Sequence, residues 1–194
     1  MRFLPKSPDD LEAHRDLRYP GDRAQARRLL LEWQRGFCAY SERYLKPLDS
    51  VEVEHFDPRL KGTERDGIAN WHAVIRWMNS HKARKIKDFE PLPNPSTWDP
   101  DRVVYRRGLF ACRDESDEET RNLIEFLGVN KPEVYQERTN HVAMIRKLRD
   151  WCSGDDNQFE ELLTESPENL AFPSALHHEL GIPAFDLIAR TIAT

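Results

Sequence analysis

The pattern of apolar and polar positions predicts helices at both ends of the chain and short strands between them. From residue 23 to residue 34, apolar side chains recur at intervals of three and four, which indicates an amphipathic helix that Gly36 would end. Residues 37–40 and 51–56 are short runs of aromatic or β-branched side chains, separated by a turn-rich Lys-Pro-Leu-Asp-Ser segment. These runs predict the two strands of a hairpin, with His55 at the end of the second.

The chain after this hairpin returns to helical spacing and then changes character. A loop is expected at 58–67, and the apolar positions of residues 70–85 predict a helix. The proline-rich stretch 89–95 predicts an extended connector, and residues 103–105 and 109–111 predict a second hairpin. Further helices are expected at 117–127, 131–152, 159–163 and 183–193.

Composition narrows the classes of protein to which the chain can belong. Apolar residues make up 39% and charged residues 32%, which is typical of a folded, polar protein. The net charge of -5 argues against a basic surface that grips nucleic acid everywhere. Three widely spaced cysteines give neither a disulfide framework nor a Cys-x-x-Cys zinc site. With no apolar run of about 18 residues, we expect a cytoplasmic protein without a membrane partner.

The candidate chemistry lies between residues 53 and 85. An unperturbed imidazole titrates near ~6.5, so His55 can accept a proton from water and serve as a general base. The Glu54 carboxylate and the Asn79 amide oxygen are ligands suited to one Mg²⁺ or Mn²⁺ ion. Because successive side chains of a strand face opposite ways, this arrangement requires the backbone to twist at Glu54 and His55.

Other polar residues near these three have supporting roles. We expect Asn70 to cap the following helix or to brace the loop by hydrogen bonds. His81 is a further candidate metal ligand. A local basic run next to the motif predicts contacts with nucleic-acid phosphates, although an isolated run of this kind is usually a solvated helix face. Its members are Arg76, Lys82, Arg84 and Lys85. Lys82, one turn beyond Asn79 on the same helical face, could meet a phosphate or brace the motif.

These residues, with Tyr40, Trp71 and the Glu-His-Phe-Asp-Pro run, resemble the HNH endonuclease family. The resemblance implies that Glu54 and Asn79 bind the metal, that His55 is the general base, that Asn70 is the central catalytic asparagine and that Lys82 is the basic residue after the second ligand. It also implies an α+β fold in which a ββα-metal core is embedded in a mostly helical domain. The expected division is a helical segment at 1–36, the core at 37–88 and a helical region at 89–194.

The sequence departs from the family pattern at the zinc clamp. Many HNH nucleases hold a structural zinc with two Cys-x-x-Cys pairs, whereas the first pair is represented here by Cys38 and Ser41 and the second by Ile75 and Met78. A structural zinc is therefore not expected, and Ile75 and Met78 are expected to pack in the core.

The expected function is metal-dependent hydrolysis of phosphodiester bonds in DNA. The stretch from Leu127 to Arg138 is similar to the helical tail of the HNH subunits of Septu-type and retron-associated phage-defence systems, which implies a defence effector controlled by a partner ATPase. The alternatives are a catalytically silent subunit that binds nucleic acid or a partner, and RNA as the substrate. His177 and His178 carry little weight as a metal patch, and Cys38 is interpreted as a packed thiol.

Overall fold

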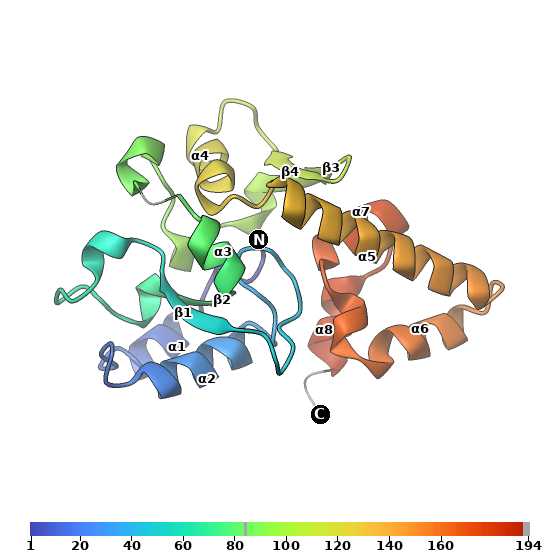
Figure 1. Ribbon diagram of the computed structural model, residues 1–194, viewed down its shortest axis with the longest axis horizontal. Coiled ribbons are helices and arrows are strands. Elements are labelled where there is room, and N and C mark those ends of the chain that lie inside the picture. The colour runs from blue at the N-terminus through green and yellow to red at the C-terminus, as the bar shows by residue number, and fades with distance from the viewer. Residues whose placement is uncertain (84, 192–194) are drawn as a thin grey trace.

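The computed structural model of the protein describes residues 1–83 and 85–191. Over these residues the fold is α+β and mostly helical, with eight α-helices and two small antiparallel sheets of two strands each (Figure 1). Helices α5 to α8 gather on one side of the molecule, while the first sheet lies on the other side with α1, α2 and α3 around it. The expected α+β class is confirmed.

The first sheet is built from a different pair of segments than the sequence pattern predicted. Strand β1 (Val51–His55) pairs with β2 (Trp71–Ile75), and helix α3 (Arg76–His81) follows β2 directly. The predicted strand at 37–40 is wrong, because this segment makes only an isolated bridge from Phe37 to Tyr44. The predicted helix at 70–85 is wrong in its first part. Residues 71–74 are buried on both faces of the sheet, and the periodicity of such a short buried segment fits a strand and a helix equally well.

Several predicted elements are confirmed. Helix α2 spans Arg23–Trp33, and strands β3 (Val103–Arg106) and β4 (Leu109–Cys112) form the second hairpin. Helix α4 (Glu118–Leu127) begins at Asp117, whose side chain accepts the Thr120 N–H, and ends at Gly128. Gly128 has a φ of 66°, a left-handed conformation that glycine adopts without strain. Helix α5 spans Pro132–Trp151.

The ends of the chain contain two helices that the apolar pattern did not predict. Helix α1 (Pro8–Ala13) begins after Ser7, whose hydroxyl accepts the Asp10 N–H. Helix α7 (Pro173–Leu180) lies between the two predicted C-terminal helices, α6 (Asp156–Glu165) and α8 (Ala184–Thr191). Residues 192 and 193 of the predicted last helix lie outside the described residues.

Two hydrophobic cores fix the first sheet in the molecule. The smaller core packs α2 against one face of the sheet, and it includes Leu30, Val53 and Trp71. The main core covers the other face. It contains Val74 and Met78 together with residues from all three of the expected segments, 1–36, 37–88 and 89–194. Within the described residues, no helix is both long enough and apolar enough to cross a membrane.

Candidate active site

The two residues at the end of β1 lie on opposite faces of the sheet. Glu54 is paired across the sheet with His72, on the face toward α3, whereas His55 is paired with Trp71, on the face toward α2. Cross-strand partners share a face and successive residues alternate. The backbone twist that the sequence analysis required to bring Glu54 and His55 together is therefore absent.

Glu54 is a buried carboxylate that is held by two donors. It is 4% exposed, and it accepts hydrogen bonds from the Tyr40 hydroxyl and the Lys82 ammonium group. Lys82 Nζ also donates to the carbonyl oxygens of His55, at 2.8 Å, and Phe56, at 3.0 Å. Burial lowers the pKa of Lys82, and the Glu54 carboxylate opposes that change. Lys82 is thus an internal cation, and it does not meet solvent as a phosphate-binding residue would.

A second lysine and a histidine extend this buried polar cluster. Lys6 Nζ lies 3.4 Å from Nδ1 of His72 and donates to the Ala69 carbonyl at 3.3 Å. Burial lowers the pKa of Lys6 to about 7 and places the pKa of His72 well below its ordinary value. The sequence analysis placed His72 on a helix, and its position across from Glu54 follows only from the pairing of β1 with β2.

His55 lies in an aromatic environment on the other face. Its side chain is 7% exposed and packs edge-on against Tyr19, with ring centres 4.7 Å apart. Asp66 Oδ1 lies 3.2 Å from His55 Nε2, outside hydrogen-bonding geometry, and accepts the Trp71 indole N–H at 2.6 Å. Burial lowers the pKa of His55, so the imidazole is neutral at pH 7. Tyr19 was missed because it lies far from the motif in the sequence, and Asp66 because it belongs to the predicted loop 58–67, where the sequence gives no side-chain direction.

Asn70 fixes the loop that follows His55. Its amide oxygen accepts the Asp57 N–H at 2.8 Å, and its amide nitrogen donates to the Asp57 carbonyl at 3.0 Å. Asn70 therefore braces the loop, which is one of the two roles expected for it; the other, a helix cap, does not apply because β2 follows it.

Replacing Asn70 with alanine is expected to lower the free energy of unfolding by about 1–3 kcal/mol, because both Asp57 backbone groups lose their partner in a partly buried position. Urea unfolding followed by circular dichroism measures this change. Asn157→Ala, an exposed position in the first turn of α6, is the matched control and should change stability by less than about 0.5 kcal/mol. Equal values for the two variants would contradict the bracing role.

The remaining candidate metal ligands have other partners. The Asn79 amide nitrogen donates to Glu52 Oε2 at 2.6 Å, so Asn79 pairs with a different carboxylate from Glu54. His81 is exposed, its ring stacks on Trp77 with centres 4.0 Å apart, and its Nδ1 lies 2.7 Å from the Trp77 carbonyl oxygen. In these positions, the Asn79 and His81 side chains do not form a binding site for a divalent cation. No group of three or more His, Cys, Asp or Glu side chains in the described part of the chain is placed to hold a metal.

The predicted phosphate-binding residues are dispersed. Arg76 is exposed, with Nε 3.7 Å from Glu52 Oε1, and Lys85 is exposed. Arg84 lies outside the described residues. Two other cations, Arg59 and Arg65, line a cavity of about 440 Å³ that opens beside Asp57 and Asn70. The sequence analysis did not single out either arginine.

The buried histidines give stability a definite pH dependence. The pKa values of His55, His72 and His141 are lowered by burial. Below about pH 6.5 the unfolded chain therefore binds protons that the folded chain does not, and the fold becomes less stable as the pH falls. Each histidine contributes at most about 1.4 kcal/mol per pH unit.

We expect a progressive loss of stability between pH 6.5 and 5.5, measured as the free energy of unfolding in urea. Lys6, with its pKa of about 7, is mainly protonated in both states in this range and contributes little. His141→Gln should reduce the slope, whereas a slope of zero or of opposite sign in the wild-type protein would refute the prediction.

No protein-family model, curated protein or solved structure matches this chain. The resemblance to the HNH family therefore depends on the residues of the motif and on their order along the chain. The structural elements that carry these residues provide the remaining argument for a function.

Proposed function

We propose that this protein is an HNH-type endonuclease that cuts DNA, and that the described conformation is its resting form. The observation that carries the proposal is the buried imidazole of His55 at the end of β1, followed directly by a loop that Asn70 holds by hydrogen bonds at the start of β2. Helix α3 then carries Asn79, and Lys82 follows at its end. A strand, a loop, a second strand and a helix with these residues in this order support an HNH assignment.

The environment of His55 suits proton transfer near a phosphodiester. A neutral imidazole can take a proton from an attacking water, and the nearby Asp66 carboxylate would stabilise the imidazolium that results. Lys61 is close enough to contribute to the lowered pKa of His55, and Arg59 and Arg65 line the cavity beside the loop. Arg59 is paired with Asp57 and Glu90, so Lys61 and Arg65 are the cations here that favour a substrate with a phosphate backbone.

The proposal of a resting form is based on the contacts that cover His55 and Glu54. Tyr19 packs over His55, while Tyr40 and Lys82 hold Glu54. Cutting would require a rearrangement of these contacts. Such a requirement is consistent with control by a partner, and we propose an ATPase subunit of a phage-defence complex in that role.

A second candidate function is a catalytically silent subunit that binds nucleic acid or a partner. The specific observation in its favour is the Lys82 ammonium group on Glu54, which supplies from within the chain the positive charge that the carboxylate needs. In this alternative, the strand and helix unit is retained for its shape.

Nicking of supercoiled plasmid, with Mg²⁺, Mn²⁺ or EDTA, distinguishes the two functions. We expect nicking by the wild-type chain to fall about 100-fold or more in His55→Ala, because the general base is lost. His14→Ala, a change at the end of α1, is the matched control and should retain activity. Tyr19→Ala should increase nicking if Tyr19 keeps the site closed. Parallel reactions on duplex RNA test the choice of nucleic acid.

Two results would count against the nuclease. Nicking that is unchanged in His55→Ala would point to a contaminating enzyme. Binding of DNA in a gel-shift assay, without nicking by the wild-type chain or by Tyr19→Ala under any metal condition, would favour the silent subunit.

A further inference from the structure

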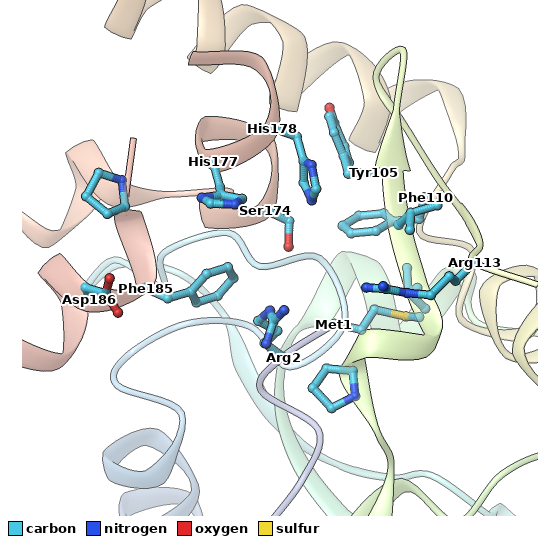
Figure 2. Close-up of a pocket in the computed structure, with 14 residues that line it drawn as sticks. Met1, Arg2, Tyr105, Phe110, Arg113, Ser174, His177, His178, Phe185 and Asp186 are labelled. Carbon is cyan, nitrogen blue, oxygen red and sulfur yellow. The ribbon is translucent and has the colours of Figure 1, made fainter. Parts of the chain in front are cut away.

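A second cavity lies between the N-terminal segment, the β3–β4 hairpin and helices α7 and α8 (Figure 2). Its volume is about 370 Å³, and none of its lining residues belongs to β1, β2 or α3. Pockets that bind small organic molecules usually measure about 300–1,000 Å³. The cavity is therefore large enough for a ligand and is separate from the candidate active site.

Two arginines and two histidines line this cavity together with one carboxylate, Asp186. Figure 2 shows the Arg2 and Arg113 guanidinium groups entering from the side opposite His177 and His178. Arg2, Arg113 and His177 are all close enough to His178 to lower its pKa, although burial is the larger cause. The lining thus carries two guanidinium groups against one carboxylate, with two imidazoles that can donate hydrogen bonds, and this balance favours an anionic ligand.

Arg113 is the best placed of these groups to bind an anion. Its Nε donates to the Asp101 carbonyl oxygen at 2.5 Å, and its two terminal nitrogens have no partner among the described residues. By contrast, Arg2 donates to the Asp101 carboxylate at 2.6 Å. A guanidinium group held by its Nε presents its remaining donors in a fixed plane, which matches the oxygens of a phosphate.

Aromatic rings provide the apolar part of the same cavity. Phe185 lies on the α8 side, with the Arg2 guanidinium carbon 5.2 Å from its ring centre, and Phe110 lies on the hairpin side. The Tyr105 ring is stacked with His178 at 6.1 Å. Phe185 is partly exposed, so a flat ring could pack against it.

We propose that this cavity binds a phosphorylated nucleoside. Arg113, His177 and His178 would bind the phosphate, and the base would pack against Phe185. The proposal is independent of the nuclease assignment, because it uses none of the residues of the candidate active site.

Isothermal titration calorimetry with 5′-AMP, adenosine and inorganic phosphate tests the proposal on the whole chain. We expect 5′-AMP to bind more tightly than either of the other two probes. Arg113→Gln should weaken 5′-AMP binding about tenfold or more, because it removes a charge-assisted contact, and His178→Gln should weaken it by a smaller factor, because it removes an imidazole hydrogen bond. Arg146→Gln, an exposed change on α5, is the matched control and should leave binding unchanged.

Phe185→Ala separates the two parts of the ligand. It should weaken binding of 5′-AMP and leave binding of inorganic phosphate unchanged. Because both substituted side chains are exposed, Arg113→Gln and His178→Gln should fold normally, which thermal unfolding verifies. The proposal is overturned if 5′-AMP does not bind, if it binds Arg113→Gln and His178→Gln as tightly as wild type, or if inorganic phosphate binds equally tightly.

Discussion

Replacement of Lys82 with methionine should lower the free energy of unfolding by about 3–5 kcal/mol, because it leaves the Glu54 carboxylate buried without its cation. The loss includes two further hydrogen bonds, from Lys82 to the carbonyl oxygens of His55 and Phe56. Both carbonyls belong to the backbone segment that carries His55, the candidate general base. Urea unfolding at pH 7.5, followed by circular dichroism and tryptophan fluorescence, measures the change.

The control for this prediction is a lysine that makes no such contacts. Lys85→Met changes an exposed side chain three residues later and should alter stability by less than about 0.5 kcal/mol. A double variant, Glu54→Gln with Lys82→Met, should be less destabilised than the sum of its single changes. The double variant removes both charges, so it leaves no buried charge unpaired. Additive changes would show that the two side chains are not coupled.

The parts of the fold that could be predicted are those with a single local interpretation. Helix α4 has helical spacing, an acidic first turn, an aspartate cap and a glycine stop, all of which indicate the same element. Strands β3 and β4 are short and are separated by a two-residue Arg-Gly turn, 107–108. Local signals that agree in this way leave little for tertiary contacts to alter.

Strand β2 could not be distinguished from a helix, because its apolar positions satisfy both periodicities. Apart from His72, residues 71–75 are apolar on both faces, and only their pairing with β1 determines that they form a strand. The pairing also decides that Glu54 faces His72 and that His55 faces Trp71. A motif read along the chain gives the order of its residues, whereas their directions depend on this long-range register.

The side chains that contact the candidate residues could not be predicted from the sequence, for the same reason. Tyr19 reaches His55 from a segment 36 positions earlier in the sequence. Lys82 was expected to meet a phosphate or to brace the motif, and its buried position fits only the second role. Its burial depends on Phe126 of α4, whose ring centre lies 5.0 Å from the ammonium nitrogen. Contacts of this kind depend on the tertiary packing of distant elements.

Arg138 in α5 is a second buried cation, and it anchors the β3–β4 hairpin to the helix. Its side chain is 0% exposed and donates to the carbonyl oxygens of Gly108, at 2.7 Å, and Val129, at 3.2 Å. The guanidinium carbon also lies 4.9 Å from the ring centre of Phe110. Arg138→Ala should therefore lower the free energy of unfolding by about 3–5 kcal/mol, through an internal cavity and two unpaired carbonyls.

A second substitution separates the contribution of packing from that of hydrogen bonding. Methionine fills much of the volume of arginine but donates no hydrogen bonds, so Arg138→Met should be less destabilising than Arg138→Ala. Arg146→Ala, on the exposed face of the same helix, should change stability by less than about 0.5 kcal/mol.

The outcome depends on a balance between two opposing terms. Burial lowers the pKa of Arg138, which means that keeping the guanidinium charged inside the protein costs free energy. The two carbonyls and the aromatic rings must offset that cost. If Arg138→Met proves as stable as the wild type, the cost of the charge equals the value of its hydrogen bonds, and the hairpin is held by packing alone. If Arg138→Met is clearly destabilised, the hydrogen bonds to Gly108 and Val129 hold the hairpin against α5.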